Sequence, residues 1–141
     1  MSRVVVDASV VVKWFTREEQ RGEALSLRRS HVDGGLTLTA PTLLVYEVVN
    51  ALRYNPSLTA EDQERAAAAL FLMGIEFEPP TPGGMAGAVE LADRYDITIY
   101  DAAYLSMAIQ RDITLVTADV RLAEKAAETG RIVDLASFAD G

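Results

Sequence analysis

The stretch Val4-Val5-Val6-Asp7 decides the fold, because it is a short apolar run that ends on a carboxylate. A continuous run of this kind, with no polar alternation, is typical of a parallel strand that is covered on both faces. Residues 114–117 form a second such run, and Asp119 follows it two residues later. The two runs therefore predict a sheet whose strands present acids at one edge.

Strand-like and helix-like segments alternate along the rest of the chain. Further strands are predicted at residues 36–39, 75–78 and 132–135, and helices at residues 10–15, 18–30, 42–54, 59–73, 85–95, 101–110 and 120–129. Pro41 is expected at the start of a helix, and Thr59 with Asp62 forms the pattern of a capping box. This alternation predicts an α/β fold with a mostly parallel sheet and helices on both faces. No linker or repeat interrupts it, so we expect one domain over residues 1–141.

Composition limits the chemistry of any site. The chain has no cysteine and one histidine, which excludes disulfides, thiolate metal sites and a polyhistidine zinc cluster. Any metal must then be a hard cation on oxygen ligands. No apolar run approaches the roughly 20 residues that span a bilayer, and Asp7 and Lys13 interrupt the valine-rich start. We therefore expect an intracellular, cytoplasmic protein with no membrane partner.

The net charge of -8 argues against a protein that simply coats DNA, because the overall field repels phosphates. It leaves room for an enzyme that acts on a phosphodiester, since bound divalent cations would cancel part of an acidic cluster. Basic residues are grouped near the N-terminus and are interpreted as a solvated helix face. They are Lys13, Arg17, Arg21, Arg28 and Arg29.

Glu47 is a carboxylate within the apolar run of residues 43–52, where an unpaired charge would be expensive. It could extend out to solvent or pair with Arg53. The alternative is a shared acidic pocket at the carboxyl ends of the strands, where ligands collect in such sheets. Asn50, one turn further along the predicted helix, is expected to orient Glu47.

Three aspartates are expected at the same edge as Glu47. Asp7 and Asp119 follow predicted strands, and Asp101 opens a predicted helix. Each of them could instead be an ordinary helix N-cap. Ser9 and Thr117 each lie two residues from an acid and are expected to hydrogen-bond a ligand or water, although Ser9 could also cap a helix.

Four carboxylates in one pocket would raise one another's pKa values unless a cation lay between them. Mg²⁺ or Mn²⁺ suits such oxygen ligands and leaves coordination positions for water and a substrate phosphate. The chemistry that follows is metal-assisted hydrolysis at phosphorus, which needs no histidine, serine or cysteine.

Four segments together carry a family resemblance: Val5-Val6-Asp7-Ala8-Ser9 continuing to Lys13-Trp14-Phe15, Tyr46-Glu47-Val48-Val49-Asn50-Ala51-Leu52, Tyr100-Asp101-Ala102-Ala103-Tyr104-Leu105, and Leu115-Val116-Thr117-Ala118-Asp119. In order and spacing they resemble PIN-domain proteins, and most of all the VapC toxins of toxin-antitoxin pairs. The resemblance implies a three-layer α/β/α fold, an Mg²⁺- or Mn²⁺-dependent endoribonuclease, homodimers, and neutralisation by a VapB-type antitoxin. It implies an acidic site of Asp7, Glu47, Asp101 and Asp119 with Asn50 and Thr117 in supporting positions.

One position departs from the family pattern, because many relatives have a further acid where this chain has Arg121. A second metal site is therefore open, and Arg121 could contact a phosphate or lie on a helix surface. The alternatives to a toxin are a non-catalytic PIN-like binding module and a housekeeping RNA-processing nuclease. A phosphoryl-transfer receiver would need paired N-terminal acids or a strand-end lysine, which neither the Asp7 nor the Asp119 segment supplies.

Overall fold

The computed structural model describes residues 2–138, so the ends of the domain expected over residues 1–141 lie outside it. Its centre is a five-stranded sheet in the order β3-β2-β1-β4-β5, and every pairing in it is parallel. This confirms the predicted sheet. The strands are β1 (Ser2–Val6), β2 (Leu36–Pro41), β3 (Glu76–Glu78), β4 (Thr114–Thr117) and β5 (Ile132–Asp134).

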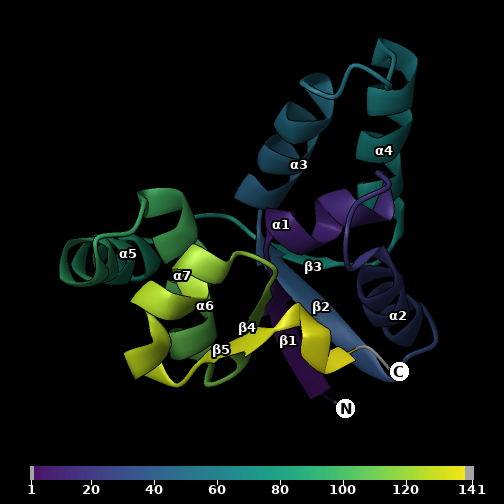
Figure 1. Cartoon of the computed structure of the whole chain (residues 1–141). Coiled ribbons are helices and arrows are strands. Elements are labelled where there is room, and N and C mark those ends of the chain that lie inside the picture. The colour runs from purple at the N-terminus through teal and green to yellow at the C-terminus, as the bar shows by residue number, and fades with distance from the viewer. Residues whose placement is uncertain (1, 139–141) are drawn as a thin grey trace.

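Helices cover both faces of the sheet, which confirms the three-layer architecture (Figure 1). The α-helices are α1 (Ala8–Val11), α2 (Arg21–Val32), α3 (Leu43–Arg53), α4 (Ala60–Leu72), α5 (Pro82–Tyr95), α6 (Ile99–Arg111) and α7 (Val120–Lys125), and the 3-10 helices are η1 (Val12–Trp14), η2 (Ala127–Thr129) and η3 (Leu135–Phe138). Helix α6 contacts β1, β2 and β4 and carries α5 on its outer side, whereas α1 and α2 cover the other face. Helices α3 and α4 pack on each other and project beyond the end of the sheet (Figure 1).

Strand β1 lies at the middle of the sheet because its valines are buried on both sides. Val5 pairs with Thr39 of β2 and with Leu115 of β4, and it has no exposed surface. Val6 pairs with Val116 and is equally buried. The continuous apolar run at the start of the chain therefore forms a central strand, as predicted.

Local sequence signals explain where several elements begin and end. The capping box before α4 is confirmed, since Thr59 Oγ1 accepts from the Asp62 amide and an Asp62 carboxylate oxygen accepts from the Thr59 amide. Pro41 is a correction, because it ends β2, where it pairs with Glu78, and does not start a helix. A strand end tolerates proline because the missing amide is not needed there, and Thr42 N donates to Glu78 O instead.

Several predicted helix boundaries moved. The helix expected over residues 10–15 is α1 followed by η1, α2 covers Arg21–Val32 where residues 18–30 were expected, and α5 begins at Pro82, three residues earlier than expected. Helix α6 begins at Ile99, two residues earlier than expected, because Thr98 acts as its N-cap and its hydroxyl accepts from the Asp101 amide at 3.0 Å. The helix predicted over residues 120–129 is divided into α7 and η2 at Ala126. Among residues 2–138, no helix combines the length and apolar character needed to cross a membrane.

Candidate active site

The strand order reverses between β1 and β4, and this switch point is where such sheets bind ligands. Asp7 directly follows β1, and Thr117 is the last residue of the neighbouring β4. Thr117 Oγ1 donates a hydrogen bond to Asp7 Oδ2 at 2.5 Å, and Ser9 Oγ donates to Asp7 Oδ1 at 2.5 Å. The two strand ends therefore meet at one edge, as the sequence predicted.

The two hydroxyls also hold the loop that carries Asp119. Ser9 Oγ accepts from the Ala118 amide at 2.9 Å, and Thr117 Oγ1 accepts from the Asp119 amide at 3.0 Å. Ser9 and Thr117 thus connect the Asp7 carboxylate to the β4–α7 loop. Their expected contact with a ligand or water stays a prediction, and their positioning role is visible in the structure.

Asp7 is a buried acid, with only 4% of its surface exposed. Burial raises its pKa to about 6, and the hydrogen bonds from Ser9 and Thr117 offset part of this rise, while the negative charge of Asp101 adds to it. A carboxylate with these neighbours carries its charge at a cost near neutral pH. A cation beside it would remove that cost.

Glu47 of α3 is half-buried, and its partner is Tyr104 of α6, which sequence reasoning missed. The Tyr104 hydroxyl donates to Glu47 Oε1 at 2.6 Å, and only 1% of Tyr104 is exposed. Burial raises the pKa of Glu47, the Tyr104 hydrogen bond lowers it, and the charge of Asp101 raises it. Within the described part of the chain, neither Arg53 nor Asn50 bonds to Glu47, and both are exposed.

A sequence signal for Tyr104 did exist. Tyr104 lies three residues after Asp101, so both residues fall on the same face of α6. That face turns toward the acids, since the charges of Glu47, Asp7 and Asp101 all raise the pKa of Tyr104, although its burial is the largest cause. The hydroxyl therefore stays protonated and remains a donor.

Asp101 is the electrostatic centre of the acidic residues. Burial and the charge of Asp119 raise the pKa of Asp101, and the hydrogen bond with Thr98 lowers it. Its own charge raises the pKa values of Asp7 and Glu47. The structure thus brings all four predicted acids into one electrostatically coupled group, which we call the acid cluster: Asp7, Glu47, Asp101 and Asp119.

The alternative role as helix caps applies to one of the three aspartates. Asp119 Oδ1 accepts from the Leu122 amide at 3.1 Å and caps α7. Asp7 occupies the N-cap position of α1 but makes no side-chain cap bond. Asp101 lies inside the first turn of α6, which Thr98 caps. The carboxylates of Asp7 and Asp101 therefore need an explanation beyond helix capping.

The acid cluster offers the oxygen donors that Mg²⁺ and Mn²⁺ prefer. Within residues 2–138, however, no three His, Cys, Asp or Glu side chains are gathered closely enough to form a ready-made metal cage. Mg²⁺ is usually held by one or two carboxylates and keeps several waters, so this open arrangement fits a hydrated ion. The identity and the ligands of the metal stay a prediction.

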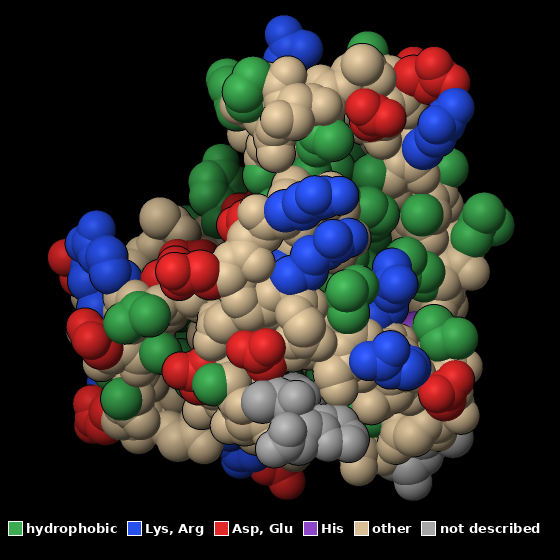
Figure 2. Space-filling view, turned by 45° about the vertical axis from the view of Figure 1, so that its right-hand side comes forward, with side chains coloured by type: hydrophobic (Ala, Val, Ile, Leu, Met, Phe, Trp, Pro, Cys, Tyr) green, Lys and Arg blue, Asp and Glu red, His purple; other side chains and the backbone are tan. Residues whose placement is uncertain are grey.

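Basic side chains gather over the α1–α2 segment, with acidic side chains beside them (Figure 2). Arg29 of α2 is exposed, as a solvated helix face requires. That interpretation is wrong for Arg17, which is exposed but lies in the loop between η1 and α2, and for Lys13. Lys13 is buried in η1, and its Nζ lies 3.8 Å from a carboxylate oxygen of Glu18. Arg121, the departure from the family pattern, is exposed on α7.

The comparisons with known proteins agree on similarity to PIN-domain and VapC proteins. The family model described as PIN domain matches residues 4–128. Ribonuclease VapC1 of Mycobacterium tuberculosis is 32% identical over 87% of this chain and 90% of that protein. The crystal structure of Mycobacterium tuberculosis VapC20, a Sarcin-Ricin loop cleaving toxin, superposes with a TM-score of 0.70 at 18% identity, over 87% of this chain and 95% of that one. VapBC2 from Rickettsia felis, bound to a DNA fragment from their promoter, gives 0.68 at 13% identity, over 94% and 98%.

Proposed function

Because the chain belongs to the PIN-domain family, we propose that it is a VapC-type endoribonuclease, the toxin of a type II toxin-antitoxin pair. The observation that carries this proposal is the acid cluster at the β1/β4 switch point, where the charge of Asp101 raises the pKa values of Asp7 and Glu47 and the charge of Asp119 raises the pKa of Asp101. An arrangement of coupled carboxylates without histidine or cysteine suits metal-dependent hydrolysis of a phosphodiester. The name of the M. tuberculosis relative, a ribonuclease, supports RNA as the substrate.

The proposed cofactor is Mg²⁺ or Mn²⁺, held by Asp7, Asp101, Asp119 and Glu47. When bound, such an ion lowers the pKa of a coordinated water and offsets negative charge at phosphorus. The protein's own contribution is positioning: Ser9 and Thr117 fix both oxygens of Asp7. Tyr104 fixes one oxygen of Glu47, and none of residues 2–138 donates a hydrogen bond to the other.

The test is cleavage of a mixed pool of structured and single-stranded RNA by protein purified without any antitoxin. Cleavage should require Mg²⁺ or Mn²⁺, stop with chelator, and be lost in Asp119→Asn. Asp93→Asn, which changes an exposed aspartate of α5, is the matched control and should cut like the parent. Equal cleavage by Asp119→Asn would show that the site assignment is wrong. No cleavage under any of these conditions would favour the non-catalytic binding module.

The proposed partners are a VapB-type antitoxin and a second copy of this chain. Similarity to the Rickettsia felis VapBC2 complex supports the antitoxin, and the Klebsiella pneumoniae toxin-antitoxin complex is similar as well. The proposed RNA substrate supports a cytoplasmic location. Co-expression with the product of a neighbouring small reading frame should yield a complex without RNase activity. A housekeeping nuclease would show no such inhibited complex.

A further inference from the structure

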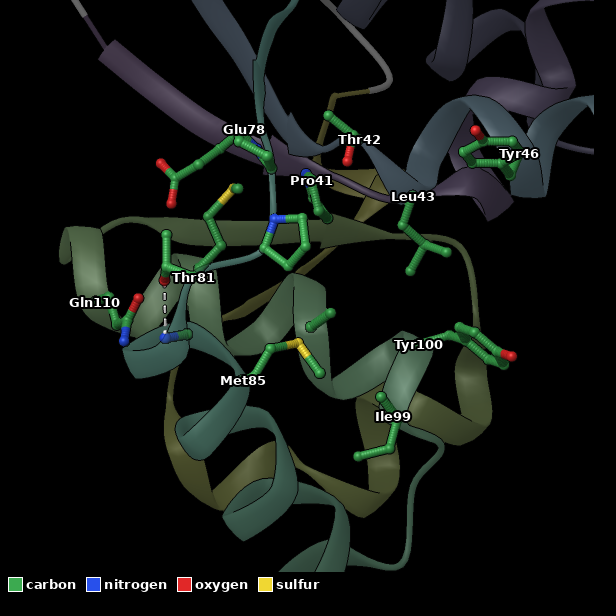
Figure 3. A pocket seen from close by; sticks show the side chains of 15 residues that line it. Pro41, Thr42, Leu43, Tyr46, Glu78, Thr81, Met85, Ile99, Tyr100 and Gln110 are labelled. Carbon is green, nitrogen blue, oxygen red and sulfur yellow. Dashed lines mark hydrogen bonds between the residues drawn. The ribbon is translucent and has the colours of Figure 1, made fainter.

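Tyr104 is the buried one of the chain's five tyrosines, with 1% of its surface exposed. It lies on α6, which packs against β1, β2 and β4. Tyr46 and Tyr100 differ, because they are 77% and 57% exposed and their rings lie at an apolar groove with a volume of about 310 Å³ (Figure 3). A phenylalanine would supply the same packing as the ring of Tyr104. The burial of a hydroxyl at this position therefore needs a polar explanation.

The explanation is the carboxylate of Glu47 on α3. The Tyr104 hydroxyl donates to Glu47 Oε1 at 2.6 Å, a length typical of a hydrogen bond to an ionised acceptor. Helix α3 projects beyond the end of the sheet, whereas α6 packs on its face (Figure 1). The hydrogen bond therefore ties a long carboxylate side chain on the projecting helix to a donor that the sheet holds in place.

This hydrogen bond makes the two oxygens of Glu47 unequal. Oε1 shares its charge with the Tyr104 hydroxyl, and none of residues 2–138 donates a hydrogen bond to Oε2. A cation that approaches Glu47 would meet Oε2 without competition. It could take both oxygens only by weakening or displacing the bond from Tyr104. Glu47 is therefore prepared to offer one oxygen and not two.

The number of oxygens that a carboxylate offers matters differently to different divalent cations. Ca²⁺ takes six to eight oxygen ligands in flexible geometry and commonly binds both oxygens of one carboxylate. Mg²⁺ requires a nearly ideal octahedron and usually combines one or two carboxylates with several waters. Mn²⁺ also suits octahedral sites of oxygen ligands. A carboxylate limited to one oxygen therefore disfavours Ca²⁺ more than Mg²⁺ or Mn²⁺.

We infer that Tyr104 determines which cation the acid cluster accepts, because it holds Glu47 Oε1 and so favours Mg²⁺ or Mn²⁺ over Ca²⁺. This inference rests on the proposed metal-dependent function. Tyr104 is a positioning residue, since it acts through Glu47 and has no contact with the cation or the substrate in this role. The selectivity is thus set by a phenol on α6 and not by the acids alone.

The experiment measures cation binding without RNA or antitoxin. Mn²⁺ binding at pH 8 is followed by electron paramagnetic resonance of the free ion, and bound Mn²⁺ is then displaced with Ca²⁺ or with Mg²⁺. Tyr104→Phe should shift the ratio of Ca²⁺ to Mn²⁺ affinity toward Ca²⁺ by about tenfold or more, the factor expected for loss of one hydrogen bond to a charged group. The ratio of Mg²⁺ to Mn²⁺ affinity should stay within a few-fold of the parent.

Tyr100→Phe is the matched control and should bind all three cations like the parent. Tyr100 lies on the same helix, and its hydroxyl bonds to none of residues 2–138. In a Glu47→Gln background, Tyr104→Phe should leave the ratio of Ca²⁺ to Mn²⁺ affinity unchanged, because the proposed effect passes through the carboxylate. A shift of equal size in that background would show a general structural effect and would overturn the inference.

Two results separate this inference from the proposed function. If Tyr104→Phe binds Mn²⁺ and its ratio of Ca²⁺ to Mn²⁺ affinity equals that of the parent, the selectivity role is overturned and the proposed function stands. If the parent binds neither Mn²⁺ nor Mg²⁺, both are overturned.

Infrared spectra of the parent test the inference without any change at Tyr104. The carboxylate stretching bands distinguish coordination through one oxygen from coordination through two. With saturating Ca²⁺, the parent should show no two-oxygen band that disappears in Glu47→Gln. Such a band would show that Glu47 offers both oxygens despite Tyr104, and this result would overturn the inference even if Tyr104→Phe did not fold.

Discussion

Asp7 should make the metal-free protein less stable as the pH rises. Its pKa is about 6 in the folded protein and 3.8 as a free aspartate. At about 1.4 kcal/mol for each pH unit between these values, ionisation of the buried carboxyl costs about 3 kcal/mol of unfolding free energy. The stability is therefore highest below pH 3.8, where Asp7 is protonated in both the folded and the unfolded protein, and about 3 kcal/mol of it is lost as the pH rises through 6. About half of it, roughly 1.5 kcal/mol, falls between pH 5 and pH 8.

The perturbation is Asp7→Asn, which keeps the shape of the side chain and removes the titration. Asparagine changes the hydrogen bonds with Ser9 and Thr117, and this shifts stability by the same amount at every pH. The pH dependence of the difference between variant and parent therefore isolates the ionisation of Asp7. Relative to the parent, the variant should gain about 1.5 kcal/mol between pH 5 and pH 8.

The assay is urea unfolding in chelator at four pH values from 5 to 8, followed by circular dichroism. Asp93→Asn on the exposed side of α5 is the control and should give a curve parallel to the parent. If the difference between Asp7→Asn and the parent stays constant over this range, the buried carboxyl does not titrate as described, and the electrostatic account of the site is refuted.

Three further predictions concern the acid cluster and the packing beside it. Asp101→Asn should raise the melting temperature in chelator, because it removes a negative charge that repels the neighbouring acids and raises their pKa values, and it should reduce the stabilisation by Mn²⁺. An unchanged melting temperature in both conditions would show that the acids lie apart. Tyr104→Phe should destabilise the protein by about 1–3 kcal/mol in denaturant melts, and it should raise the pKa of Glu47 because it removes the hydrogen bond that lowers it. Carboxyl NMR titration measures this pKa, and an unchanged value would show that the hydrogen bond is absent in solution. Gly87→Ala should lower the unfolding free energy by about 1–3 kcal/mol, because the added Cβ would lie 2.6 Å from a serine hydroxyl of α6. Gly22→Ala is the control and should be neutral or stabilising, because nothing lies within 4 Å of its Cβ; equal melting temperatures of the two variants would contradict the close α5–α6 contact.

Most of the fold could be predicted because its signals are local. The valines before Asp7 fixed the central strand, and the Thr59–Asp62 pair fixed the start of α4. Pro41 was misplaced because the same residue suits a helix start and a strand end, and only the pairing with β3 distinguishes them. The early start of α6 depended on Thr98 as a cap, which was not recognised from the sequence.

The site was predicted in part for a related reason. Strand ends in a parallel sheet share an edge, so Asp7 and Asp119 could be brought together from their positions alone. The partner of Glu47 could not be predicted from the sequence, because Tyr104 lies 57 residues away and the contact depends on how α3 and α6 face each other. Asn50 was predicted to orient Glu47 because it lies about one helix turn away. It is exposed to solvent instead, and spacing along one helix did not reveal that the partner comes from another helix.

The most direct test of the central claim is cleavage of a mixed RNA pool by the antitoxin-free protein, before and after Mn²⁺ is added to a chelated sample, alongside Asp7→Asn. The account predicts that the parent cuts RNA only after Mn²⁺ is added and that Asp7→Asn does not cut in either state. Cleavage in chelator, or equal cleavage by Asp7→Asn, would contradict a metal-dependent nuclease built on the acid cluster.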